Sequence, residues 1–169
     1  MPFEISVPEG RAPVTSRPHR ISLILAKKVD ATRNQYLAVG LIQHSTSPYS
    51  SPLVVIPKKA RGVRNTVNYK KLNQISSLSH LPIPRVAQVL DCLGKGRAFS
   101  LFDLISSFHQ ITAQKDTVPL TAFCTLAGLY EWLVMPQGSS ASPGWLACRL
   151  CFTRMVSLVF PGWDAVTAR

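Results

Sequence analysis

The sequence predicts an α+β fold, with an antiparallel or mixed sheet and packed helices, and three observations support this. Short runs rich in β-branched residues, such as 53–56, indicate strands, and longer segments with apolar residues at helical spacing indicate helices. The two kinds of segment lack the regular strand–helix–strand alternation of a parallel sheet. Of the 169 residues, 46% are hydrophobic and only 16% are charged, which predicts one domain with a sizeable core rather than disorder.

The expected elements follow in order from the N-terminus. Residues 1–18 are rich in proline and polar groups and predict an irregular lead-in. A loosely helical face runs through 19–39, and Gly40 is a candidate C-cap. Residues 53–56 and 66–69 predict the strands of a hairpin whose basic turn, 58–64, contains Gly62. Beyond it we expect a short helix at 85–93, strands at 98–102, 110–113, 121–125 and 130–134, a turn at 136–143 and a helix at 145–159.

The charge of the chain is strongly one-sided. Nineteen Lys and Arg residues against eight Asp and Glu residues give a net charge of +11. Such an excess favours a polyanionic partner, with nucleic acid first and an anionic membrane surface second. A basic protein whose charge serves only solubility is the alternative, and charge alone does not separate the two.

Nothing in the sequence predicts a secretory signal or a membrane span. Residues 1–16 lack the basic-then-apolar pattern of a signal peptide, and the apolar stretch 146–160 is interrupted by Arg149 and Arg154. An intracellular chain with reduced cysteines is therefore expected. Cys148 and Cys151 form a C-x-x-C pair without a second pair, which favours core packing over a zinc site.

Asp103 is the first candidate for chemistry, because it ends the predicted apolar strand 98–102. A carboxylate at the end of a buried strand is costly unless a cation or hydrogen-bond donors meet it. In nucleotidyl transfer that cation is Mg²⁺, which takes hard oxygen ligands and bridges phosphates. The simpler alternative is an N-cap for the turn 106–109.

A series of motifs gives this aspartate a context. They include Arg64-Asn-Thr-Val-Asn-Tyr-Lys-Lys-Leu-Asn73, Leu81-Pro-Ile-Pro-Arg85, Phe99-Ser-Leu-Phe-Asp-Leu104, Phe108-His-Gln-Ile111 and Tyr130-Glu-Trp-Leu-Val-Met-Pro-Gln-Gly138, together with 40–42, 45–59 and 121–123. In this order they resemble the reverse transcriptase of gypsy-type LTR retrotransposons and, more distantly, that of retroviruses. The resemblance covers about residues 20–145. It implies the fingers and part of the palm of a right-hand polymerase, with RNA or DNA template-primer and dNTP as partners.

The resemblance also implies roles for individual residues. Asp103 matches the first metal-binding aspartate, which would hold Mg²⁺ together with the carboxylates of a Tyr-x-Asp-Asp motif. Arg64 and one of Lys58 or Lys59 match residues that grip the triphosphate, and Phe108 matches the position that excludes a 2′-hydroxyl. Gln137 and Gly138 match a turn that contacts nucleotide and template. Without the resemblance, the lysines would be read as a solvated hairpin tip, Phe108 as core and Gly138 as a turn glycine.

The sequence also departs from the family. Asn68 stands where relatives usually carry aspartate, and Ala147 where many carry glutamine. Residues 146–169 stop matching, which suggests a lead-in at 1–18, a matching region at 19–145 and a divergent tail at 146–169. At the relatives' spacing from Asp103, Tyr-x-Asp-Asp is expected near 165–168, which read Ala-Val-Thr-Ala. A small insertion could place the motif beyond Arg169.

Three hypotheses follow from these observations. The first is a fragment of a retroelement reverse transcriptase that does not polymerise alone. The second is a non-catalytic basic module that binds nucleic acid, and the third is the product of a decayed reading frame without a stable fold, since half a palm leaves sheet edges unpaired.

Overall fold

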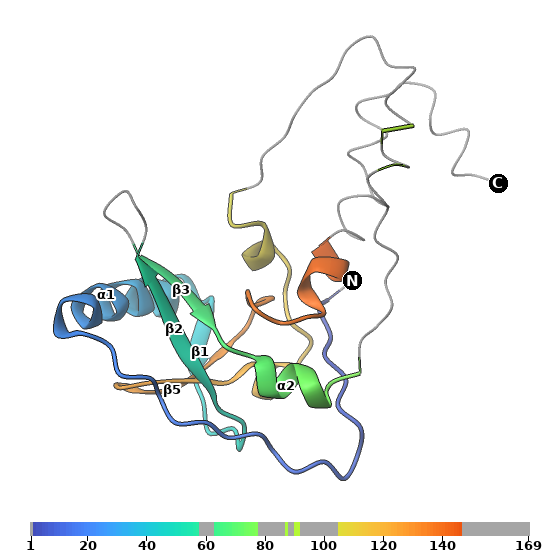
Figure 1. Cartoon of the computed structure of the whole chain (residues 1–169), viewed down its shortest axis with the longest axis horizontal. Helices are drawn as coiled ribbons and strands as arrows, with labels where there is room; N and C mark the ends of the chain where they lie inside the picture. Colours follow the sequence, from blue (N-terminus) through green and yellow to red (C-terminus); the bar gives the residue numbers. More distant parts are fainter. Residues whose placement is uncertain (1, 58–62, 78–86, 88–89, 92–104, 147–169) are drawn as a thin grey trace. The chain divides into compact units, whose positions relative to one another are not determined.

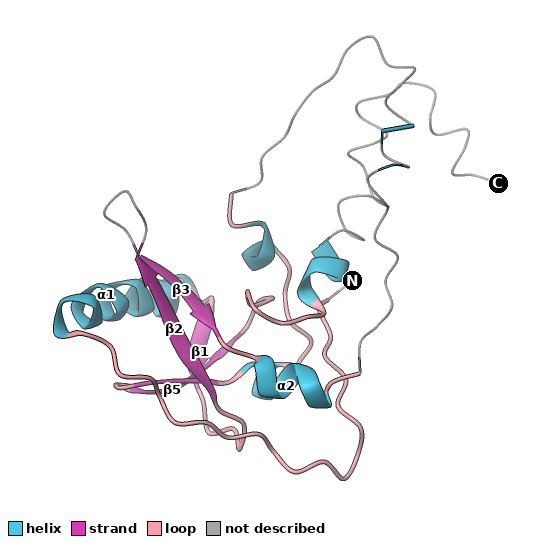
Figure 2. Cartoon of the chain, in the orientation of Figure 1, coloured by secondary structure: helices cyan, strands magenta, loops and turns pink. Residues whose placement is uncertain are grey.

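A five-stranded mixed sheet, in the order β1-β5-β4-β2-β3, is the centre of the fold (Figure 1). The computed structural model describes residues 2–57, 63–77, 87, 90–91 and 105–146. The strands are β1 (Ile42–His44), β2 (Ser51–Pro57), β3 (Val63–Val67), β4 (Phe123–Thr125) and β5 (Gly128–Trp132). Only β2 and β4 pair in parallel; every other neighbouring pair in this sheet is antiparallel. The mixed α+β architecture expected from the sequence is therefore present (Figure 2).

The predicted basic hairpin is confirmed as the pair β2 and β3. Leu53 lies opposite Val67, and Ile56 lies opposite Arg64. The return strand begins at Val63, earlier than the predicted 66, and ends before Asn68. The tip 58–62, which includes Lys58 and Lys59, lies outside the described residues.

A short helix that the sequence did not predict, α2 (Lys70–Ile75), follows β3 directly. Tyr69 is its N-cap, and the side-chain oxygen of Asn68, one residue earlier, accepts a hydrogen bond from the Lys70 N–H at 3.1 Å. Leu72 is the residue of α2 that enters the core. A helix of six residues carries too little periodicity to be read from a sequence.

The long helix α1 (Leu23–Val39) ends at the predicted C-cap. Gly40 adopts the left-handed conformation, and its N–H bonds to the Leu37 carbonyl at 3.1 Å. The helix begins four residues later than predicted, and Val29 is its buried residue. Leu23 and Ile24, in its first turn, are exposed.

The segment predicted as a lead-in contains no regular helix or strand before residue 23, yet it packs into the core. Phe3 is fully buried, and its backbone bonds to the Thr112 carbonyl and the Gln114 N–H, both at 2.8 Å. Ile5 is also buried, and its N–H donates to the Thr117 hydroxyl at 3.0 Å. These contacts join residues more than a hundred positions apart, so no local pattern could reveal them.

The C-terminal half of the sheet matches the expected strands in part. β4 lies within the predicted strand 121–125, whereas β5 begins and ends two residues before the predicted strand 130–134. The strand predicted at 110–113 was wrong in kind, because 107–110 form a 3-10 turn and Thr112 makes only an isolated bridge to Val134. Of the helix predicted at 145–159, only its beginning is described, and residues 142–146 are helical. Asp103 and the strand 98–102 lie outside the described residues.

Two compact units divide the chain. The first contains residues 1–78 and 108–142 and holds the whole sheet, and the second contains 79–107 and 143–169. The site described below lies within the first unit. None of the helices described is long and apolar enough to cross a membrane.

Candidate functional site

Arg64 and Gln137, two residues assigned separately to nucleotide binding, lie against each other. Arg64 is exposed on β3, and Gln137 is half-exposed in the turn that follows β5. The Nε and Nη2 atoms of Arg64 both donate to the Gln137 Oε1 atom at 3.4 Å. These are long bonds, so the guanidinium keeps most of its donor capacity for another acceptor.

The next residue, Gly138, sits at a position that only glycine fits. Its φ is +105°, and a Cβ there would lie 2.4 Å from the carbonyl oxygen of Val67, the last residue of β3. A side chain would therefore meet backbone that cannot move without disturbing the hairpin. The turn is pressed against the strand that carries Arg64, and this contact brings Gln137 to the guanidinium.

Asn73 of α2 holds the same turn through both atoms of its amide. Its Nδ2 atom donates to the Gly138 carbonyl at 3.2 Å, and its Oδ1 atom accepts from the Ser140 N–H at 3.0 Å. Asn73 lay inside a matching motif, but its sequence context gave no reason to assign it a role. The structure shows it as a positioning residue for the turn of Gln137 and Gly138.

Tyr69 is the buried residue next to this turn. The side chain is buried, and its hydroxyl donates to the Thr121 carbonyl at 2.6 Å. Burial raises the pKa of Tyr69 well above its ordinary value, so the phenol stays neutral and keeps donating. The Tyr69 ring also lies 3.6 Å from where a Cβ on Gly138 would stand. Tyr69 thus ties the end of β3 to the segment that precedes β4.

Phe108 lies half-buried in the 3-10 turn Ser107–Gln110, on a different segment from Arg64 and Gln137. The next side chain, His109, is stacked on Trp132 of β5 with ring centroids 5.0 Å apart. Tyr36 of α1 meets His109 edge-on at 5.7 Å. Burial lowers the pKa of His109 below its ordinary value, so the neutral imidazole is the stable form in this aromatic contact.

The carboxylates of the described part of the chain do not form a metal site. No group of three or more His, Cys, Asp or Glu side chains gathers among the described residues. Glu131 is buried, and its two oxygens accept hydrogen bonds from Gln43 and Ser45, each at 2.6 Å. Asp103, Lys58 and Lys59 lie outside the described residues, so their predicted roles remain predictions. The predicted convergence of Asp103, Phe108 and Gln137 around one cleft is likewise a prediction.

Comparison with known sequences identifies close relatives. Residues 56–159 match the family described as reverse transcriptase (RNA-dependent DNA polymerase). The retrovirus-related Pol polyprotein from transposon 297 of Drosophila melanogaster is 36% identical over 137 residues, which cover 78% of this chain. The chain spans about 13% of the length of that polyprotein.

Solved structures show the same fold. The native protease-reverse transcriptase of prototype foamy virus matches 83% of this chain and 19% of its own, with a TM-score of 0.75 at 20% identity. The foamy viral protease-reverse transcriptase in complex with an RNA/DNA hybrid also matches 83% of this chain and 19% of its own, with a TM-score of 0.70 at 21% identity. The expected fold, the fingers and part of the palm of a right-hand polymerase, is confirmed.

Proposed function

Because the chain belongs to the reverse transcriptase family and corresponds to part of a retroelement reverse transcriptase, we propose that it binds the incoming nucleotide and the template-primer of an RNA-directed DNA polymerase. The observation that carries this proposal is the contact of Arg64 with Gln137 beside Gly138. Arg64 on β3 and Gln137 and Gly138 in the turn after β5 are positions that the family uses for nucleotide contacts. They lie on one surface, where α2 holds the turn beside β3.

Arg64 is the phosphate-binding residue of this site. Its planar fork of donors suits the oxygens of a triphosphate. Gln137 orients that fork through two long hydrogen bonds and leaves donors of the guanidinium for the phosphate. Lys58 and Lys59 precede Arg64 by a few residues in the sequence and supply further positive charge. Since β3 is paired along its whole length with β2, Arg64 is presented from a rigid strand.

Phe108 selects the sugar in this proposal. A bulky ring beneath the sugar admits hydrogen at the 2′ position and clashes with a hydroxyl, so deoxynucleotides are preferred. The stacking of His109 on Trp132 and its edge contact with Tyr36 support this role, because they fix the turn that carries Phe108. A sugar gate must be rigid to discriminate by size.

Polymerases of this family use divalent cations, and Mg²⁺ is the proposed cofactor, with Asp103 as one ligand. The described residues do not themselves form a site that fits the ion, since none of their His, Cys, Asp or Glu side chains gather in threes. The proposal for Asp103 rests on its match to the family motif.

A non-catalytic module that binds nucleic acid is the second candidate. Beyond Asp103 the sequence has only Asp116, Glu131 and Asp164 as acidic residues, and none is adjacent to another carboxylate. Both oxygens of Glu131 are already hydrogen-bonded in the sheet. The net charge of +11 favours binding of a polyanion in either case.

Binding of a fluorescent deoxynucleoside triphosphate by the purified chain tests the first proposal. Arg64→Ala should weaken binding about tenfold or more, because a charge-assisted phosphate contact contributes about 1.5–3 kcal/mol. Lys28→Ala is the matched control, since Lys28 is an exposed cation on α1, to which no nucleotide contact is assigned. Equal affinities of the two variants would refute the assignment of Arg64.

A further inference from the structure

Three polar side chains with buried, unpaired atoms line one cavity. Arg33 of α1, Asn65 of β3 and Trp132 of β5 all face this cavity, which is otherwise walled mostly by apolar side chains. The Nε atom of Arg33, the Oδ1 atom of Asn65 and the Nε1 atom of Trp132 are each buried and have no hydrogen-bond partner within the protein. Buried polar groups in native proteins are nearly always paired, so the coincidence of three in one place indicates a ligand.

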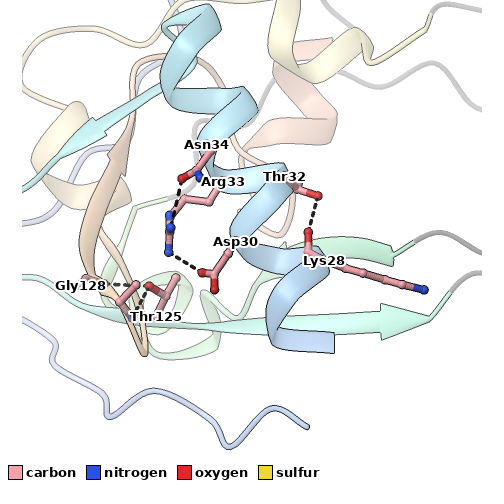
Figure 3. Close-up of polar contacts among 8 residues, drawn as sticks. Lys28, Asp30, Thr32, Arg33, Asn34, Thr125 and Gly128 are labelled. Carbon is pink, nitrogen blue, oxygen red and sulfur yellow. Dashed lines mark hydrogen bonds and ion pairs between the residues drawn. The ribbon is translucent and has the colours of Figure 1, made fainter. Parts of the chain in front are cut away.

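Arg33 cannot satisfy its Nε atom by turning elsewhere. Its Nη1 atom is paired with Asp30 at 2.5 Å, and its Nη2 atom donates to Asn34 at 3.0 Å (Figure 3). The guanidinium carbon also lies 5.6 Å from the centroid of the Tyr130 ring. These contacts hold the side chain over the hairpin of β4 and β5, and rotation toward solvent would break them.

The Trp132 ring is also fixed, because it packs against Tyr36 at 5.5 Å and Phe123 at 5.6 Å between centroids, in addition to His109. The backbone of Asn65 is held in the β2–β3 ladder opposite Val55. Arg33 and Trp132 cannot turn away without losing these contacts, so a partner must come to them.

The chemistry and the size of the cavity both match a single water molecule. The unpaired atoms of the three polar lining residues are two N–H donors and one carbonyl acceptor, and a water molecule accepts two hydrogen bonds while donating one or two. The volume of the cavity is about 10 Å³. That is close to the minimum of about 10–15 Å³ that one water molecule requires. An anion would be repelled by the Asn65 oxygen, and an apolar molecule would leave all three groups unpaired.

We propose that this cavity is a binding site for one ordered water molecule. The water accepts from the Nε–H of Arg33 and the Nε1–H of Trp132, and it donates to the Oδ1 of Asn65. It thereby joins α1, β3 and β5 at one point. Asn65 adjoins Arg64 on β3, so the water also ties the strand that presents the guanidinium to the helix behind it.

Dipolar contact between water and the Trp132 indole proton tests the proposal. In the full ¹⁵N-labelled chain, the indole signal is assigned by its disappearance in Trp132→Phe. We expect cross-peaks to the water resonance in both NOE and rotating-frame experiments, with the opposite signs that exclude proton exchange and indicate a residence time beyond about a nanosecond. No dipolar cross-peak from the Trp132 indole in the wild-type chain would overturn the proposal.

Two substitutions at Asn65 make the test specific. Asn65→Leu removes the acceptor and fills the cavity, so the cross-peak should be lost while the indole signal remains. Asn65→Asp keeps an acceptor of the same size, so the cross-peak should persist. A cross-peak that survives unchanged in Asn65→Leu would place the water elsewhere and refute the site. Should Asn65→Leu fail to fold, Arg33→Lys removes the Nε donor and should weaken the cross-peak at least twofold.

Discussion

The side-chain amide of Asn73 is bound to the backbone of Gly138, with 3.2 Å between its Nδ2 atom and the Gly138 carbonyl oxygen. The two residues are 65 positions apart. The contact joins the helix after the fingers hairpin to the turn that contains Gln137. Together with the close approach of Gly138 to Val67, it fixes the geometry in which Arg64 and Gln137 meet.

Gly138→Ala should destabilise the chain by about 2–4 kcal/mol. The added methyl group would stand 2.4 Å from the Val67 oxygen, and the φ of +105° is itself strained for alanine. Urea unfolding followed by circular dichroism measures the loss. Gly10→Ala is the control, since Gly10 also has a positive φ, +80°, but nothing lies within 4 Å of its added Cβ. A loss at Gly138 no larger than the loss at Gly10 would contradict the role of close packing.

Asn73→Ala should lower triphosphate affinity more than it lowers stability. The two amide bonds are exposed to solvent, so their removal costs only about 1 kcal/mol of unfolding free energy. The turn of Gln137 then loses its anchor and Arg64 its orientation. Affinity for a fluorescent triphosphate should fall about three- to tenfold, by about 0.7–1.4 kcal/mol. Unchanged affinity in a folded Asn73→Ala chain would show that the turn does not need this anchor.

Stability should fall as the pH drops below about 6.5, and His109 should account for part of the fall. Burial lowers the pKa of His109 in the folded chain, whereas the unfolded chain keeps a value near 6.5. The unfolded state therefore binds more protons in this window, and stability rises with pH through it. Its neighbours in the stack are Tyr36, whose pKa burial raises, and the uncharged Trp132, so no anion opposes the effect.

The difference in unfolding free energy between the wild type and His109→Phe isolates the contribution of His109 to the pH dependence. Because the imidazole is half-exposed, solvent screening keeps the difference below about 1 kcal/mol between pH 7.5 and 5.5. The urea midpoints of the wild type and of His109→Phe should approach each other as the pH falls, because the wild type loses stability faster. Parallel curves would show that His109 does not titrate differently in the folded chain.

The sequence predicted those parts of the fold that depend on local patterns. The β2–β3 hairpin and the Gly40 cap follow from β-branched runs, a glycine-containing turn and a helix end, all of which are short-range signals. The burial of Phe3 and Ile5 could not be predicted, because their partners Thr112 and Thr117 are distant in the chain. The clamp of Asn73 on Gly138 was missed for the same reason. The resemblance assigned Arg64 and Gln137 to nucleotide binding, but their mutual contact required the structure.

The 169-residue chain should not extend a primer on an RNA template with Mg²⁺ or Mn²⁺. Two-metal catalysis needs two ions about 3.5–4 Å apart, and Asp103 alone cannot hold that spacing. The other acidic residues beyond it are isolated in the sequence, and Glu131 is bonded to Gln43 and Ser45. Gel analysis of a labelled primer measures extension. Synthesis that Asp103→Asn abolishes would prove the prediction wrong, whereas synthesis that survives this change would indicate a contaminating polymerase.

Binding of duplex nucleic acid should be weak, with little sequence preference, and should depend steeply on salt. The net charge of +11 supplies the attraction, and the cations around the hairpin, Lys58, Lys59, Arg61, Arg64, Lys70 and Lys71, supply the phosphate contacts. Each neutralised phosphate releases a condensed counterion, so log K falls with log salt by about 0.9 per contact. Three to five contacts within reach of one hairpin give a slope of roughly −2.7 to −4.5.

The double substitution Lys59→Ala with Arg64→Ala should flatten that slope by about two units without changing sequence preference. Lys27→Ala with Lys28→Ala is the matched control, because it removes the same charge from exposed positions on α1. Titrations against duplex at several salt concentrations give the three slopes. If binding is carried by the hairpin, only the first pair flattens the slope. If the charge acts as a diffuse cloud over the whole surface, both pairs change it equally, and the hairpin is not the binding surface.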